Sequence, residues 1–490
     1  MYLIGYDIGS SSIKAALIEA KSGKAIGVVQ YPATEMEILA PQPGWAEQDP
    51  ETWWNYLCQA TKFLLLQTAI PPEAIQAIGI AYQMHGLVVV DKHQQVLRPS
   101  IIWCDSRAVA IGKEAFEAIG EERCLSHLLN APANFTASKL KWVKENEPEV
   151  YARIHKWMLP GDYIAMRFTG AIATTPAGLS EGVFWDFKNN TIADFLLNHF
   201  GFQEELIPKV LPTFSIQGQL TREAAEASGL KPGTPVSYRA GDQPNNALAL
   251  NVLQPGEVAA TGGTSGVVYG VVDKAVYDPK SRVNSFLHVN HSAEVPRIGV
   301  LLCINGAGIQ YSWLKRQLAA NATSYRHLEV LAQEIPIGAD GLHILPFGNG
   351  AERMLGYKNI GAQILGLNFN RHEKAHLYRA ALEGIAFAFV YGVEILQNMG
   401  LDTRLMRVGN DNLFQSDVFS QTIATLLNCS IEVIETTGAI GAAKGAGVAI
   451  GIPLLYPDSS LKTYEPAHQI SLYQQAYQTW RSDLDYLLSK

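Results

Sequence analysis

The first residues of the chain place a short polar turn between two apolar runs. Residues 2–6 are mostly apolar, Asp7 follows them, and residues 13–18 form the second run. Between the runs lies Gly9–Ser12, a glycine followed by three serines. This pattern predicts a β-hairpin. The turn would present backbone N–H groups to phosphate oxygens, with the Asp7 carboxylate beside them as a ligand for Mg²⁺.

The same pattern returns beyond the middle of the chain. Residues 258–261 and 267–272 are apolar runs on either side of Gly263–Gly266. Turns of this composition are common, so one alone says little about phosphate binding. Two of them, one in each half of the chain, suggest two similar domains that face each other across a nucleotide.

The rest of the pattern alternates helices with strands. Cap residues and periodicity predict helices at 51–67, 221–228, 306–320 and 370–400, the last with Asn370 and Glu373 as its N-terminal box. Apolar runs predict strands at 77–81, 87–91, 101–107 and 235–239. Residues 438–456, rich in glycine and alanine, favour a tightly packed helix followed by a loop over a membrane span. This order predicts α/β domains with mixed sheets.

The composition is that of a large enzyme with several cores. The chain has 490 residues, of which 48% are hydrophobic and 17% charged, so we expect a division into domains 1–246 and 247–490. The net charge of −8 has no block of like charges, which argues against a nucleic-acid partner. No leader or uninterrupted apolar span indicates a membrane partner, and five scattered cysteines are typical of a reducing compartment. We therefore expect a cytoplasmic protein.

Asp242 is the candidate catalytic carboxylate. It follows the predicted strand 235–239 and the small residues Ala240 and Gly241, so its side chain would protrude at the edge of a sheet. A carboxylate there can accept a proton from a hydroxyl group during phosphoryl transfer. The alternative is a cap for a helix that begins near Pro244, and the local pattern leaves both readings open.

Two aromatic side chains are candidates for binding a sugar. His85 lies in the polar turn between two predicted strands, where its ring could hydrogen-bond a sugar hydroxyl. Trp45 could stack on the apolar face of a sugar. A structural histidine and a core tryptophan are the alternatives, and the sequence alone does not choose.

Eight motifs resemble those of the FGGY-type carbohydrate kinases, in the family's order: residues 6–12, 44–50, 83–86, 102–107, 159–163, 241–242, 263–266 and 381–384. The resemblance extends from residue 2 to about residue 451. Within the family, the turn Gln83-Met84-His85-Gly86 resembles the branch that acts on xylulose.

The resemblance implies two actin-like ATPase domains of the ribonuclease-H type, with mixed sheets around a central cleft. It implies transfer of the ATP γ-phosphate to the terminal hydroxyl of D-xylulose, with Asp242 as general base and Asp7 beside Mg²⁺. It assigns ATP binding to Ser10, Ser11, Ser12, Lys14, Gly263, Thr264, Gly306, Gln310, Gly409 and Asn412. It assigns sugar binding to Trp45, Gln83, Met84, His85, Asp242, Gln243 and Asn245.

The chain departs from the family pattern at two places. Gln243 follows Asp242 where many relatives have asparagine, and residues 408–414 replace a triple-glycine segment that contacts adenosine. Residues 438–443 do resemble the helix that closes this end of the site. The alternatives are another kinase of the family, acting on ribulose, fuculose, glycerol or a related polyol, or an actin-like ATPase that needs no Asp242. The sequence leaves a homodimer open.

Overall fold

Both predicted hairpins form, and each begins a large mixed sheet. In the computed structural model, which describes residues 1–457 and 460–490, β1 (Tyr2–Ile8) pairs antiparallel with β2 (Ile13–Glu19). In the second half, β15 (Glu257–Gly262) pairs in the same way with β16 (Gly266–Val272). The hydrophobic pattern alone located these two elements.

The first sheet has the strand order β13-β14-β5-β1-β2-β3. Its other strands are β3 (Ala25–Tyr31), β5 (Ile75–Tyr82), β13 (Phe214–Gln219) and β14 (Pro235–Gly241). Strands β1, β5 and β14 are parallel, whereas β2, β3 and β13 run antiparallel to their neighbours. The carboxyl ends of β1 and β14 therefore lie at the same edge of this sheet.

The second sheet repeats this topology. Its order is β17-β18-β16-β15-β21-β22-β23, with β17 (Asn284–Leu287), β18 (Ile298–Ile304), β21 (Leu405–Gly409), β22 (Ser430–Ile434) and β23 (Ser460–Tyr464). Again an antiparallel meander is joined to two parallel strands and a final antiparallel one, with β17 as an extra edge strand. The repeat suggested by the two hairpins is thus present in the strand topology.

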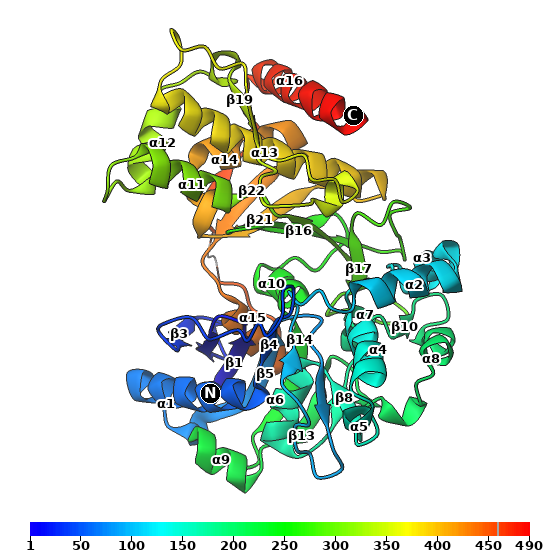
Figure 1. Ribbon diagram of the computed structural model, residues 1–490. Coiled ribbons are helices and arrows are strands. Elements are labelled where there is room, and N and C mark those ends of the chain that lie inside the picture. Colours follow the sequence, from blue (N-terminus) through cyan, green and yellow to red (C-terminus); the bar gives the residue numbers. More distant parts are fainter. Residues whose placement is uncertain (458–459) are drawn as a thin grey trace.

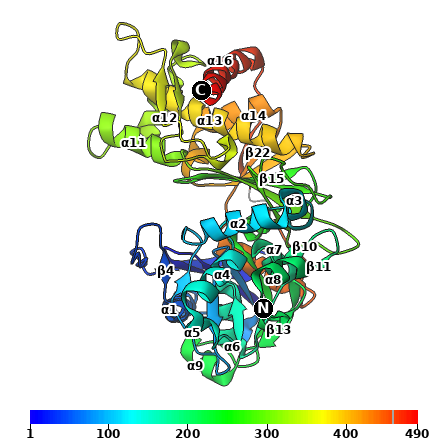
Figure 2. The same cartoon turned by 45° about the vertical axis from the view of Figure 1, so that its right-hand side comes forward.

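Helices cover both sheets, and the two halves lie one above the other in both views (Figures 1 and 2). The helices before the second sheet are α1 (Pro50–Thr68), α2 (Val109–Ile119), α3 (Glu121–Leu128), α4 (Thr136–Asn146), α5 (Pro148–Tyr151), α6 (Pro160–Thr169), α7 (Pro176–Glu181), α8 (Asp194–Phe200), α9 (Arg222–Ser228) and α10 (Asp242–Ala249). Those that follow β18 are α11 (Gly308–Leu318), α12 (Tyr325–Gln333), α13 (Lys374–Asn398), α14 (Asp417–Leu427), α15 (Gly438–Val448) and α16 (Ile470–Ser489).

Five two-stranded sheets complete the fold. They pair β4 (Glu47–Gln48) with β7 (Ser100–Ile101), β6 (Val88–Val90) with β8 (Lys156–Met158), β9 (Ala173–Thr174) with β12 (Lys209–Val210), β10 (Trp185–Asp186) with β11 (Thr191–Ile192), and β19 (His343–Leu345) with β20 (Gln363–Leu365).

Helix α15 returns from the far end of the chain to the first sheet, where it packs on β1 and β5 (Figure 1). A side chain at Gly5 or Gly79 would collide with the backbone of this helix. The small residues of α15 and these two glycines therefore allow a close approach of helix and sheet. The predicted boundary after residue 246 falls within α10. Residues 438–448 pack with the first sheet although in sequence they lie between β22 and β23 of the second sheet.

Helix α13 is long and apolar enough to span a membrane, but 89% of its apolar window is buried in the protein. The prediction that it begins at Asn370 is wrong, because the N-cap is Glu373, whose N–H donates to His376 Nδ1 at 3.1 Å. Asn370 instead belongs to a turn, in which its N–H donates to Asn368 Oδ1 at 3.0 Å.

The strand predicted at 101–107 is also too long, since β7 ends at Ile101. The chain curls around the buried Asp105, which accepts hydrogen bonds from Arg107 and from the Ala46 N–H. These side-chain bonds compete with strand pairing and end the strand.

Candidate active site

The first hairpin places Asp7 at the carboxyl end of β1. Its cross-strand partner is Lys14, and the turn closes where Gly9 N–H donates to the Ser12 carbonyl at 3.1 Å. Burial raises the pKa of Asp7, and the positive charge of Lys14 opposes that rise. A Cβ atom at Gly438 would lie 2.5 Å from Asp7 Oδ2, so the carboxylate lies against the first residue of α15.

Asp242 lies at the same edge of the sheet, where β14 ends and α10 begins. It is the first residue of α10, and the N-cap is Gly241. The alternative of a capping aspartate is therefore wrong. Its side chain is partly exposed. Burial and, second, the charge of Asp7 raise the pKa of Asp242 to about 7, while hydrogen bonds from Gln243 act in the opposite direction. This carboxyl group is thus poised to gain or lose a proton near neutral pH.

The second hairpin borders a cavity of about 720 Å³. Of the predicted ATP-binding residues, Gly263, Thr264 and Asn412 line it, together with residues of α11, α12 and α14. The carbonyls of Gly263 and Thr264 accept hydrogen bonds from the N–H groups of Gly308 and Ile309 at 3.0 and 3.1 Å. These bonds fix the hairpin to the start of α11, so the cavity has a rigid wall on this side.

The other seven predicted ATP-binding residues do not line this cavity. Gly306 is a packing residue, because a side chain there would collide with the Pro346 carbonyl, and its N–H donates to Glu352 Oε1 at 3.0 Å. Gln310 lies in the first turn of α11, and its buried Oε1 has no hydrogen-bond partner among the residues described. Gly409 ends β21 beside Asp411. Ser10, Ser11 and Lys14 lie on the opposite, first-domain hairpin, where Ser12 is buried.

The predicted sugar turn holds His85 in a left-handed backbone conformation, with φ of 63°. Its Nδ1 lies 2.9 Å from the Glu181 carbonyl, and the ring packs against Phe135 and Phe286 at centroid distances of 4.8 and 5.4 Å. Burial, and then the charge of Lys139, lower the pKa of His85 to about 3. The ring is therefore neutral at pH 7. Because a carbonyl only accepts, Nδ1 carries the proton and Nε2 is a free acceptor.

Met84 and Gln83, from the same turn, are both buried. Met84 is buried, and its Cγ would lie 2.6 Å from a Cβ atom at Gly241, so it packs beside the residue that precedes Asp242. Gln83 is also buried, and its Nε2 donates to Gln48 Oε1 at 3.4 Å.

The structure gives two predicted sugar-binding residues other roles. Asn245 is fully buried, and its Nδ2 donates to the Gly438 carbonyl at 2.8 Å, so it joins α10 to α15 instead of facing a sugar. Trp45 packs under the Arg107 guanidinium, 3.8 Å from the ring centroid, and edge-on to Trp142. These two contacts make Trp45 part of a structural cluster.

Sequence reasoning missed Trp103, an exposed aromatic residue beside the first hairpin. Its side chain is 52% exposed, and its Nε1 donates to Ser10 Oγ at 3.2 Å on the first hairpin. An exposed indole beside a phosphate-type turn is suited to stacking on a sugar. Trp103 lies in the motif 102–107, but a tryptophan within a predicted strand is normally assigned to the hydrophobic core.

Glu181 was missed as well. It is 2% exposed at the end of α7, and its Oε1 has no hydrogen-bond partner among the described residues. Burial, followed by the charge of Asp242, raises the pKa of Glu181 well above its ordinary value. The Glu181 carboxyl group touches Gly241, where no side chain would fit. No local sequence pattern marks it.

The carboxylates at the edge of the first sheet fit a Mg²⁺ ion only if phosphate oxygens of a substrate supply further ligands. In residues 1–457 and 460–490, no cluster of three or more His, Cys, Asp or Glu side chains is placed to hold a metal by itself. Mg²⁺ is commonly held by one or two carboxylates together with substrate phosphates and water. Asp7 would provide the carboxylate of such a site.

Comparisons with known proteins match this chain over most of its length. Residues 2–249 match the model of the N-terminal domain, and residues 258–450 that of the C-terminal domain, of the FGGY family of carbohydrate kinases. The xylulose kinase of Haemophilus influenzae is 28% identical, over 99% of each chain. The L-xylulose/3-keto-L-gulonate kinase of Escherichia coli is 29% identical, over 98% of this chain and 96% of its own.

A crystal structure of xylulose kinase from Rhodospirillum rubrum superimposes with a TM-score of 0.88 at 27% identity, covering 100% of both chains. The two halves therefore form the actin-like, two-domain fold expected from the sequence.

Proposed function

Since the chain belongs to the FGGY family of carbohydrate kinases, we propose that it transfers the γ-phosphate of ATP to the terminal hydroxyl of D-xylulose, giving D-xylulose 5-phosphate. The observation that carries the proposal is Asp242, a carboxyl group with a pKa of about 7 at the edge of the sheet where Asp7 also lies. This is the chemistry that a general base for a hydroxyl group needs.

In the proposed reaction, ionised Asp242 accepts the proton of the terminal sugar hydroxyl. The hydroxyl oxygen then bonds to the γ-phosphorus as the bond from that phosphorus to the β,γ-bridging oxygen breaks, and ADP leaves with the electron pair. Ser10, Ser11, Ser12 and Lys14 on one side and the 263–264 turn on the other would hold the phosphates. Mg²⁺ held by Asp7 would offset the negative charge of the phosphate oxygens.

The nucleotide base would occupy the cavity of about 720 Å³ on the second domain. Its volume is within the range of small-ligand pockets. We retain the division into a sugar-binding domain of residues 1–246 and an adenosine-binding domain of residues 247–490 as part of this proposal. Because ATP is a cytoplasmic substrate, we propose that the enzyme acts there.

The sugar would lie between Asp242 and His85, with Trp103 against its apolar face. The acceptor His85 Nε2 would take a hydrogen bond from a sugar hydroxyl. The names of several relatives, which are xylulose kinases, support D-xylulose. The relative from Escherichia coli that carries L-xylulose in its name makes the enantiomer the second candidate.

A coupled assay of ADP release tests the proposal. With ATP fixed, D-xylulose, L-xylulose, D-ribulose, L-fuculose, glycerol and gluconate are compared by kcat/KM. The highest value should belong to D-xylulose, and mass spectrometry should find one phosphate on its terminal carbon. A preference for another sugar would change the proposed substrate and leave the proposed kinase activity in place. ATP hydrolysis that no sugar accelerates would instead favour an actin-like ATPase.

A further inference from the structure

The backbone of the sugar turn is strained at His85. A φ of 63° is unusual for a residue with a side chain, because the Cβ atom then crowds the backbone. Such a conformation persists only where its surroundings hold it. The question is which contacts hold this one.

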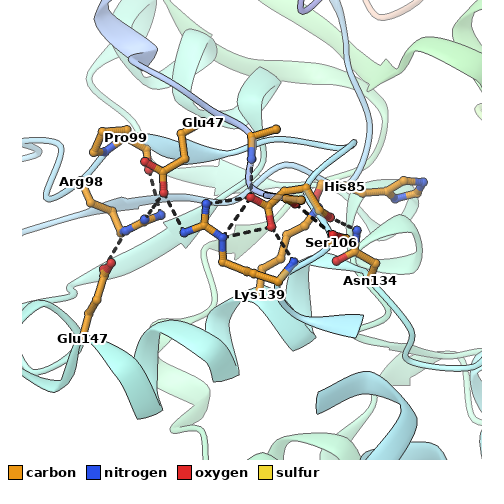
Figure 3. A network of polar contacts seen from close by, with 12 residues as sticks. Glu47, His85, Arg98, Pro99, Ser106, Asn134, Lys139 and Glu147 are labelled. Carbon is orange, nitrogen blue, oxygen red and sulfur yellow. Dashed lines mark hydrogen bonds and ion pairs between the residues drawn. The ribbon is translucent and has the colours of Figure 1, made fainter. Parts of the chain in front are cut away.

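Lys139 reaches the turn from α4. Its side chain is 0% exposed, and Nζ donates to the His85 carbonyl at 2.8 Å. Figure 3 shows the lysine extending to the His85 backbone while the imidazole ring points away from the polar network. The left-handed residue is thus held on two sides, by Lys139 at its carbonyl and by the Glu181 carbonyl at its ring.

The nearby carboxylate of Asp105 is already engaged by other donors, so it does not take the place of the His85 carbonyl as the acceptor for Lys139. Asp105, also 0% exposed, accepts hydrogen bonds from Arg107 Nη2 at 2.7 Å and from the Ala46 N–H at 2.6 Å. Burial lowers the pKa of the Lys139 ammonium to about 7, and the charge of Asp105 opposes that change. A buried cation is retained at a cost and needs a hydrogen-bond acceptor. The acceptor that the fold supplies is the His85 carbonyl.

The network around Lys139 fixes its position further. Arg107 also pairs with Glu47 at 2.7 Å, and Arg98 joins Glu47 to Glu147, which follows α4, at 2.5 and 2.7 Å (Figure 3). Helix α4, which carries Lys139 in its first turn, is therefore fastened near its C-terminal end.

We propose that Lys139 is a positioning residue for sugar binding. Its ammonium group holds the left-handed His85 backbone so that the imidazole presents Nε2 to a sugar hydroxyl. This inference rests on the proposed function, because it acts through the contact between His85 and the sugar.

Calorimetric titration with D-xylulose at pH 6.5, where the ammonium is mostly protonated, tests this role. Lys139→Met should weaken sugar binding at least about tenfold, the effect of losing a charge-assisted hydrogen bond, and should leave MgADP binding within about twofold of wild type. Lys141→Met is the matched control, because Lys141 lies on the same helix and pairs at the surface with Glu145. Lys139→Gln is the second variant, with the same expectation, should Lys139→Met fail to fold.

A double-mutant cycle separates positioning from general support of the fold. If Lys139 acts through the imidazole, Lys139→Met should add less than about threefold to the loss already caused by His85→Ala. The proposal would be overturned if the loss of sugar affinity in the double variant equalled the product of the losses in the two single variants. Unchanged sugar binding in a folded Lys139 variant would also overturn it. Wild-type protein that binds no D-xylulose would count against the proposed function instead.

Discussion

The charge of Asp7 acts on Asp242, adding to the larger effect of burial and bringing the pKa of Asp242 to about 7. The two carboxyls come from β1 and β14, which lie on either side of β5 and end at the same edge of the sheet. Ligands of open α/β sheets bind at the carboxyl ends of the strands. In the proposed mechanism the pair would combine a metal ligand, Asp7, with a base, Asp242, whose pKa matches neutral working conditions.

This pairing predicts the acid limb of the pH profile. Asp242 acts as a base only when ionised, so kcat/KM for the sugar should fall about tenfold per pH unit below pH 6 and level off above pH 8. Asp7→Asn removes the charge that opposes ionisation, so the midpoint of the residual activity should move to lower pH. A flat profile of kcat/KM from pH 5 to 8 would contradict the assignment.

Asp242→Asn should abolish most turnover while sugar and nucleotide still bind. Loss of a general base typically costs about 10²–10⁴ in rate, and calorimetry should show dissociation constants close to those of the wild type. A kcat near the wild-type value would refute the proposed mechanism.

The same variant should alter stability in a pH-dependent way. The folded pKa of Asp242 is raised above its unfolded value, so the carboxyl group favours the folded state at low pH and loses that effect as pH rises through about 7. The melting temperature of Asp242→Asn should therefore exceed that of the wild type by more at pH 8 than at pH 5. An equal difference at both values would mean that the pKa of Asp242 is not raised.

Asp7 should govern the use of the metal. Asp7→Ala removes a carboxylate ligand, so the variant should use MgATP poorly, and a tenfold increase in Mg²⁺ should restore little activity because the site itself is lost. Initial rates against Mg²⁺ concentration, at saturating sugar, measure this. An unchanged Mg²⁺ dependence would leave Asp7 with a structural role at the end of β1.

A substitution at Gly438 tests the position of the Asp7 carboxylate without removing it. A methyl group there would lie 2.5 Å from Asp7 Oδ2 and must displace it. Gly438→Ala should therefore lower kcat about tenfold or more, since small misplacements at a reacting centre are costly. Ala449→Ser, just beyond the same helix, should leave kcat unchanged. Wild-type kcat in Gly438→Ala would show that the position of Asp7 is not critical.

Local signals in the sequence located the two hairpins, the strand before Asp242 and the turn at residues 83–86, because each depends on neighbouring residues. Packing between distant segments could not be read in this way. The side chain of Asn245 is bonded to α15, which arrives almost two hundred residues later in the chain. Trp45 and Trp103 look alike in sequence, and only the position of Arg107 shows which indole is covered. Glu181 and Lys139 reach the site across the fold and have no local signature.

His85 carries the prediction about the substrate. If Nε2 accepts a hydrogen bond from D-xylulose, His85→Ala should lose about 1–3 kcal/mol of transition-state binding, which is about ten- to a hundredfold in kcat/KM. The slow hydrolysis of ATP without sugar should change little, because other residues bind the phosphates. His93→Ala, at an exposed site in the next turn, is the control. Since the pKa of His85 is about 3, the ring stays neutral from pH 5 to 8, and the loss should be the same across that range. Equal losses in kinase activity and in ATP hydrolysis would show that His85 supports the fold, and the choice of sugar would then rest on the relatives alone.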